Sequence, residues 1–185
     1  ERMNLRDDAA RFATMAKTRK AAMDRHLWNA EAGLYLDYDV VAAKQAQKPY
    51  ITTFYPLWAG AASPEQARAL QRHVAAFEMK GGLAMSLDAS GAQWDAPFGW
   101  APTNWLSVAG LDAYGFHGDA ARIAGKFTAT IDRSLAHDGT IREKYNMATG
   151  DADVKVTAGY SENVIGFGWS NGVYLKMQAL MARTP

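Results

Sequence analysis

Residues 63–88 read SPEQARALQRHVAAFEMKGGLAMSLD, and this stretch contains one complete unit of the fold. It opens like a helix N-terminus, because Ser63 can cap the helix, Pro64 suits the first turn and Gln66 completes a capping box. Apolar side chains then recur at helical spacing, at Ala67, Leu70, Val74 and Phe77. We expect the helix to stop at the glycine pair 81–82 and to lead into a short extended segment.

The same order of helix, glycine turn and extended segment recurs along the chain at roughly 50-residue intervals. The three extended segments are residues 33–39, 82–88 and 139–145. Apolar spacing and end signals predict five further helices, at 6–28, 50–60, 103–114, 119–136 and 170–183. Pro56 interrupts the helix at 50–60. Such a repeat is typical of stacked helical hairpins, so we predict an all-α fold of three hairpins.

The composition excludes several classes of protein. The chain has 185 residues, 20 of them basic and 19 acidic, and its net charge of +1 comes from charges that are spread along the sequence. It therefore lacks the clustered basic surface that binds nucleic acid or an anionic membrane, and neither is expected as a partner. No apolar run approaches the roughly 20 residues of a membrane helix, so we expect a soluble protein.

Metal and cofactor sites are not predicted either. The chain has no cysteine, which excludes disulfides and thiolate metal sites. Its four histidines show no ligand spacing; they are His26, His73, His117 and His137. The chain begins at Glu1 rather than at a methionine, and we expect that a leader or an upstream domain precedes it.

Aromatic residues gather in two loops that also carry amides, acids and glycines. Residues 93–102 read QWDAPFGWAP and residues 159–172 read GYSENVIGFGWSNG. An indole face beside polar groups can bind the C–H face and the hydroxyls of a sugar. The alternative is that these tryptophans only fill the ends of a helical bundle. The polar neighbours favour a carbohydrate site.

Glu143 is the candidate catalytic carboxylate. It lies between Arg142 and Lys144, and two cations within a few ångströms would keep it ionised, as a general base requires. A glutamate between two cations can equally be a solvated surface residue. The flanking residues alone leave both interpretations open.

The motifs resemble those of the trehalases, family 37 of the glycoside hydrolases. Residues 93–102 are similar to the family signature Gln-Trp-Asp-x-Pro-x-Gly-Trp-x-Pro at every fixed position. Residues 143–145 match the family's Glu-Lys-Tyr, and residues 166–173 resemble Gly-Phe-Gly-Trp-Thr-Asn-Gly-Val, with Ser170 in place of threonine. Residues 19–40 also resemble a trehalase stretch. The matches follow the family's order, and the resemblance identifies residues 1–185 as a single unit, the C-terminal half of the catalytic domain.

The resemblance implies a fold and a set of roles. The fold would be about half of an (α/α)6 toroid, and the reaction would be the inverting hydrolysis of trehalose to glucose without a cofactor. Glu143 would be the general base. A further substrate-binding glutamate of the family falls at Tyr160 when residues are counted back from Gly166, or at Glu162 if two residues are deleted; we favour Glu162 because a carboxylate accepts from two hydroxyls at once. The substrate-binding residues implied in this way are Gln93, Trp94, Asp95, Trp100, Tyr160, Glu162 and Trp169.

Part of the family pattern is absent from these 185 residues. Nothing in them matches the first trehalase signature or the aspartate that acts as general acid. We therefore expect an N-terminal chain or segment to complete the toroid and to supply the acid. Two alternatives remain: another (α/α)6 glycosidase that acts on a small α-glucoside or α-mannoside, and a non-catalytic sugar-binding helical module derived from such an enzyme.

Overall fold

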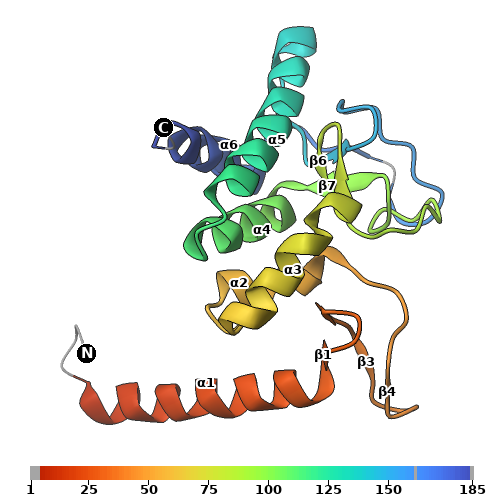
Figure 1. Ribbon diagram of the computed structural model, residues 1–185. Helices are drawn as coiled ribbons and strands as arrows, with labels where there is room; N and C mark the ends of the chain where they lie inside the picture. Colours follow the sequence, from red (N-terminus) through yellow and green to blue (C-terminus); the bar gives the residue numbers. More distant parts are fainter. Residues whose placement is uncertain (1–4, 161, 184–185) are drawn as a thin grey trace.

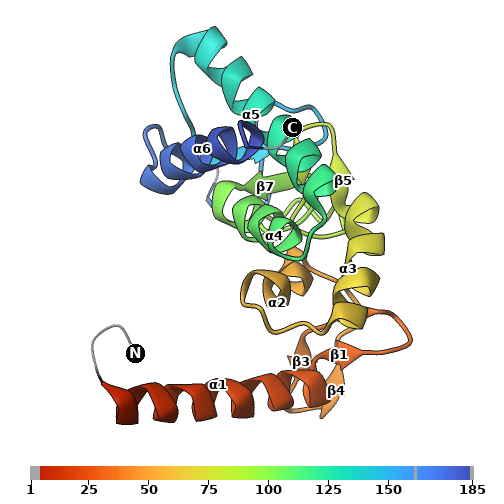
Figure 2. The same ribbon diagram turned by 60° about the vertical axis from the view of Figure 1, so that its left-hand side comes forward.

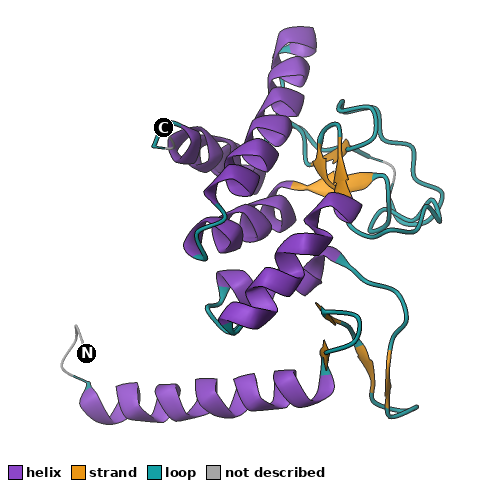
Figure 3. Cartoon of the chain, in the orientation of Figure 1, coloured by secondary structure: helices purple, strands orange, loops and turns teal. Residues whose placement is uncertain are grey.

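The structure is a computed structural model that describes residues 5–160 and 162–183 (Figure 1). Helices of the described residues are α1 Arg6–His26, α2 Tyr55–Trp58, α3 Pro64–Phe77, α4 Ala101–Ala113, α5 His117–Asp138 and α6 Gly168–Met181. A 3-10 turn at Ile51–Phe54 precedes α2. Strands are two or three residues long: β1 Trp28–Asn29, β2 Leu34–Tyr35, β3 Tyr38–Asp39, β4 Lys44–Gln45, β5 Glu78–Met79, β6 Gly82–Leu83, β7 Phe98–Trp100 and β8 Lys144–Asn146. The expected predominance of helix is confirmed (Figure 3).

The capping box that opens α3 forms as the sequence predicts. The hydroxyl of Ser63 accepts from the backbone N–H of Gln66 at 3.2 Å, and the Gln66 side chain accepts from the Ser63 N–H at 2.7 Å. The apolar stripe of this helix is buried. The helix ends at Phe77, four residues before the predicted glycine stop, because Glu78 and Met79 pair with Leu83 and Gly82 in a small hairpin.

Similar pairing shortens the first helix. α1 ends at His26 rather than at residue 28, since Trp28 and Asn29 pair with Tyr35 and Leu34. α5 ends at Asp138, two residues beyond the predicted end, and stops at Gly139, which adopts a left-handed φ of +73°. The helix expected at 50–60 is a 3-10 turn followed by the four-residue α2, with Pro56 in the first turn of α2.

Helix α4 lies at the centre of the molecule and packs against α2, α5 and α6. Its close approach to α2 depends on Gly110, where a Cβ atom would lie 2.7 Å from Leu57 Cβ and from the backbone N of Trp58. Val108 and Leu111 of α4 are fully buried in the core with Phe127 of α5. This packing fixes the ends of the helices, from which the short hairpins and loops emerge.

Helix α1 extends away from the rest of the molecule (Figures 1 and 2). None of its residues is buried. Its apolar stripe contacts the core only near the C-terminal end, through Met23, while Phe12 and Met15 are 57% and 54% exposed. The predicted helix is confirmed, and most of its apolar face is left uncovered by residues 5–160 and 162–183. In the part of the chain that the structure describes, no helix is long and apolar enough to cross a membrane.

Candidate active site

The β7–β8 ladder joins two of the motifs that the sequence singled out. β7 is the end of the aromatic loop 93–102, and β8 begins directly after Glu143. The two strands are antiparallel, with Trp100 opposite Lys144 and Gly99 opposite Tyr145. A side chain at Gly99 would collide with Met147, since a Cβ atom would lie 2.6 Å from its Cγ. The ladder therefore fixes Glu143 beside the tryptophan loop.

Glu143 is a buried carboxylate with one engaged and one free oxygen. Its side chain is 3% exposed, which excludes the solvated-surface interpretation. The Tyr160 hydroxyl donates to Oε1 at 2.5 Å. Within the described residues Oε2 has no hydrogen-bond partner, and Lys144 Nζ lies 3.9 Å from it. Buried polar atoms are seldom left without a partner, so Oε2 is an acceptor that a bound water or substrate could satisfy.

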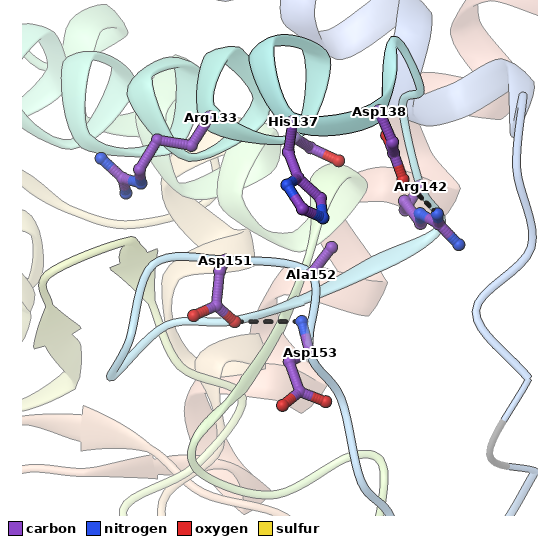
Figure 4. Close-up of a pocket in the computed structure, with 8 residues that line it drawn as sticks. Arg133, His137, Asp138, Arg142, Asp151, Ala152 and Asp153 are labelled. Carbon is purple, nitrogen blue, oxygen red and sulfur yellow. Dashed lines mark hydrogen bonds and ion pairs between the residues drawn. The ribbon is translucent and has the colours of Figure 1, made fainter.

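Only one of the two flanking cations faces Glu143, and the expectation that both would do so is wrong for Arg142. Its Nη2 lies 2.5 Å from Asp138 Oδ2 (Figure 4). Arg142 therefore lines a separate cavity at the end of α5, together with Arg133, His137 and Asp138. The cause is the end of α5: Asp138 is its last residue, and the chain turns back after Gly139 so that Arg142 pairs with the Asp138 carboxylate.

Lys144 is fully buried between two aromatic rings. Its Nζ lies 3.7 Å from the centroid of the Tyr160 ring and 5.5 Å from that of Trp100. It also donates to the Tyr160 carbonyl at 3.0 Å. Burial lowers the pKa of Lys144, although the charges of Glu143 and Glu162 oppose this change. Lys144 is thus a compact cation that ties the loop at Tyr160 to the ladder.

Three tryptophans meet around Trp100, the one beside Lys144, and we name them the tryptophan cluster: Trp94, Trp100 and Trp169. Trp100 is fully buried, stacks on Trp94 at 4.0 Å and meets Trp169 edge-on at 6.0 Å. Trp94 and Trp169 remain 44% and 38% exposed. The cluster combines the two interpretations of the sequence: Trp100 fills the interior, while its two neighbours present aromatic surface to solvent.

Gln93 connects the aromatic loop to the long segment 147–159. Its carbonyl accepts from Trp100 Nε1 at 3.2 Å, and its backbone N–H donates to the carbonyl of Ala158 at 3.1 Å. Gly159, at φ +112°, lies so close that a Cβ atom would be 2.7 Å from Gln93 Cδ. The Oε1 atom of Gln93 is buried and has no hydrogen-bond partner among the described residues. Gln93 Oε1 therefore resembles Glu143 Oε2: each is an oxygen that can still accept a hydrogen bond.

Asp95 has a different environment from the other predicted site residues. Its carboxylate is 8% exposed and accepts from Ser86 at 2.9 Å and from Ser90. Burial acts to raise the pKa of Asp95, but hydrogen bonds from Ser90, Ser86 and Tyr50 outweigh it and hold the pKa below the usual range. The carboxylate fixes the aromatic loop, and its predicted contact with substrate stays a prediction.

The two positions weighed for a further substrate-binding residue, Tyr160 and Glu162, both lie near Lys144. Tyr160 donates a hydrogen bond to Glu143. Glu162 is exposed, but it lies close enough for its negative charge to oppose the burial that lowers the pKa of Lys144. Sequence reasoning missed two supports of this region. Asn163 braces β8 by accepting from the Lys144 N–H and donating to its carbonyl, and Lys144 itself holds Tyr160. Both depend on contacts across 16 to 19 residues, for which the local sequence carries no signal.

The arrangement around Glu143 suits chemistry that uses a carboxylate as a base. Among residues 5–160 and 162–183, no group of three or more His, Asp or Glu side chains lies in a position to hold a metal ion. A buried carboxylate with a free oxygen, next to partly exposed indoles, can accept a proton from a water molecule held near a sugar ring.

Comparison with known proteins identifies relatives along nearly the whole chain. A sequence model of the Trehalase family matches residues 1–182. A periplasmic trehalase of Xanthomonas campestris is 40% identical over 169 residues, which cover 90% of this chain and 29% of that protein. The solved structure of a neutral trehalase from Saccharomyces cerevisiae superposes with a TM-score of 0.78 and 31% identity, over 93% of this chain and 31% of the yeast chain. The chain thus spans less than a third of the length of these trehalases.

A second solved structure supports the fold class. A mannosylglycerate hydrolase of glycoside hydrolase family 63, from Thermus thermophilus, matches with a TM-score of 0.67 and 25% identity over 89% of this chain and 36% of its own. Both matched enzymes are (α/α)6 toroids, and the six helices of the described residues form about half of such a toroid. The family match over residues 1–182, the shared motifs and the fold agree, and the chain belongs to the trehalase family.

Proposed function

We propose that this chain is part of an inverting trehalase and supplies its general base, Glu143. The observation that carries the proposal is the buried carboxylate whose Oε2 has no hydrogen-bond partner within the described residues. A general base needs an ionised oxygen that no protein hydrogen bond occupies, within reach of one water molecule. The trehalase relatives supply the substrate class, since both are named as trehalases.

In the proposed reaction, Glu143 Oε2 takes a proton from a water molecule as the water oxygen attacks one anomeric carbon of trehalose. The glycosidic C–O bond breaks on the opposite face, and the departing oxygen receives a proton from a carboxylic acid. An inverting pair of carboxyl groups stands roughly 6.5–9.5 Å apart, which leaves room for the water. We propose that the acid belongs to a segment outside these 185 residues.

The same missing segment accounts for the exposed apolar face of α1. Phe12 and Met15 face solvent here, and helices of a complete toroid bury such faces against the next hairpin. We therefore propose that an N-terminal part of the enzyme covers α1 and closes the ring. Residues 1–185 would then form one unit, the C-terminal half of the catalytic domain.

The substrate pocket would be lined by the tryptophan cluster, with Gln93 and Glu162 at its polar edge. Trp94 and Trp169 offer apolar faces for the C–H groups of glucose. Gln93 Oε1 and the Glu162 carboxylate offer acceptors for hydroxyl groups. Asp95 would act indirectly, by keeping Trp94 in place.

The stereochemistry of the product tests this proposal. Both anomeric carbons of trehalose are α, so an inverting enzyme releases one β-glucose from the attacked carbon and one α-glucose from the leaving group. Proton NMR in the first minutes, before mutarotation, should show equal amounts of the two anomers. A product that is α-glucose alone would contradict the inverting assignment.

A second candidate is hydrolysis of an α-mannoside, which the match to mannosylglycerate hydrolase favours. The chain would be assembled with the segment that carries the acid and assayed on trehalose and on mannosylglycerate side by side. Turnover of trehalose alone supports our proposal. Turnover of mannosylglycerate alone would replace it, and failure of the assembly to hydrolyse either compound would favour the non-catalytic sugar-binding module.

A further inference from the structure

We propose that Tyr160 is the positioning residue of the base: its hydroxyl holds Oε1 of Glu143 and thereby makes Oε2 the oxygen that takes the proton from water. This inference rests on the proposed function of Glu143. It gives Tyr160 a role that differs from the substrate contact expected at its place in the sequence, because it acts through Glu143 rather than on the sugar.

The contacts of Glu143 distinguish its two oxygens. Oε1 accepts a hydrogen bond from the Tyr160 hydroxyl at 2.5 Å, whereas Oε2 has no hydrogen bond within the described residues. The backbone of Glu143 is also fixed, because its N–H donates to the Val164 carbonyl at 2.9 Å. With both the backbone and one oxygen held, rotation of the carboxylate is restricted, and Oε2 keeps one direction.

Tyr160 is itself held in place from the other side. Its side chain is 45% exposed, so packing alone would leave the ring mobile. The buried Lys144 donates to the Tyr160 carbonyl at 3.0 Å, and its Nζ lies 3.7 Å from the ring centroid. The cation therefore fixes both the backbone and the ring of Tyr160. Lys144 also lies 3.9 Å from Oε2, beyond hydrogen-bond range, so its direct interaction with the carboxylate is an ion pair and leaves Oε2 without a hydrogen bond.

To hold Glu143 in this way, the Tyr160 hydroxyl must keep its proton and donate a hydrogen bond to Oε1 throughout the reaction. Burial, together with the hydrogen bond to Glu143 and its negative charge, raises the pKa of Tyr160 to about 12. The hydroxyl therefore keeps its proton at neutral pH and does not compete as a base. The water proton goes to Oε2, the water oxygen bonds to the anomeric carbon, and the leaving oxygen takes its proton from the separate carboxylic acid.

Titration of the tyrosines tests the contact on this chain as it stands. In protein labelled with 13C at tyrosine Cζ, the Tyr160 signal, assigned by its loss in Tyr160→Phe, should show no titration between pH 8 and 10.5. Glu143→Gln removes the charge and should shift the titration of the same signal to lower pH. Tyr174 donates to Asp132 at 2.6 Å and provides the matched control, whose titration should not respond to Glu143→Gln. A Tyr160 signal that is identical in both proteins would overturn the contact.

Kinetics of the assembly with the acid-bearing segment test the role. Tyr160→Phe keeps the ring on which Lys144 lies and removes only the hydroxyl. It should lower kcat about tenfold and leave KM within about twofold, because the lost interaction orients the base and does not bind substrate. Tyr174→Phe should change neither value. A rise in KM at unchanged kcat would assign Tyr160 to substrate binding and overturn the proposal.

The two experiments separate this inference from the proposed function. If Glu143→Gln retains normal turnover, the base assignment fails even when the tyrosine titration still reports the Tyr160–Glu143 contact. If Glu143→Gln abolishes turnover while Tyr160→Phe leaves kcat unchanged, the base assignment stands and the positioning role of Tyr160 is refuted.

Discussion

The indole rings of Trp94 and Trp100 lie parallel, 4.0 Å apart at an interplanar angle of 9°, although one ring is fully buried and the other is 44% exposed. Trp100 is fixed by the β7–β8 ladder and by its own N–H, which donates to Gln93. It therefore acts as a rigid support for Trp94. A flat indole held in this way loses little freedom when it binds a sugar ring.

Trp94→Ala should weaken trehalose binding in the active assembly by about 1–3 kcal/mol, the scale of a lost aromatic contact. Isothermal titration calorimetry on the inactive Glu143→Gln background would measure this change without turnover. Trp58→Ala is the matched control, since Trp58 on α2 is 56% exposed and lies outside the tryptophan cluster. Equal affinities for the Trp94→Ala and unaltered proteins would show that the cluster only fills the interior.

The exposed face of α1 predicts how the chain behaves alone. We expect it to self-associate or to bind a hydrophobic dye, because Phe12 and Met15 form an uncovered apolar surface. Replacing both with serine should reduce dye binding and leave the helical circular dichroism nearly unchanged, since no residue of α1 is buried. Sedimentation that shows a compact, monodisperse monomer without dye binding would refute the uncovered half-toroid.

Glu78 predicts a pH-dependent contribution to stability. Hydrogen bonds from Arg122 hold the pKa of Glu78 below its usual range; burial opposes this, and Lys126 adds to it. A carboxylate with a lowered pKa stabilises the fold above its unfolded-state pKa, and this contribution disappears as the pH falls through the folded-state value. Glu78→Gln should lower the free energy of unfolding by about 1–2 kcal/mol at pH 7.

Urea denaturation at pH 7 and pH 3 would measure the Glu78 effect, and the difference between the Glu78→Gln and unaltered proteins should shrink at the lower pH. Asp153→Asn serves as the control, because Asp153 is 73% exposed and its cation lies 3.8 Å away. It should change stability by less than about 0.5 kcal/mol. A Glu78→Gln effect that is the same at both pH values would exclude the electrostatic explanation.

The helices could be predicted because their signals are local. The cap at Ser63 and the stop at Gly139 depend on residues within one turn, and both form as expected. The ends at His26 and Phe77 could not be predicted, since short hairpins that begin directly after them take over the backbone hydrogen bonds. Local spacing does not reveal that pairing.

The residues of the candidate site could be predicted from the sequence, but their contacts and burial could not. Glu143 and the two tryptophan loops could be recognised from their motifs. The burial of Glu143 could not be predicted, because its neighbours in sequence are two cations and the burial results from the β7–β8 ladder. Likewise, the pairing of Arg142 with Asp138 depends on where α5 ends. The contact of Tyr160 with Glu143 spans 17 residues and required the structure.

The most direct test of the account is the turnover of Glu143→Gln in the active assembly. Glutamine keeps the size and the acceptor for Tyr160 but removes the basic oxygen, so kcat should fall by a factor on the order of 10² to 10⁴. Trehalose affinity should be retained, which also shows that the protein is folded, and Glu65→Gln, an exposed substitution on α3, should leave kcat unchanged. Near-normal turnover of Glu143→Gln, or a glycosyl adduct trapped on Glu143, would contradict the assignment of Glu143 as the general base.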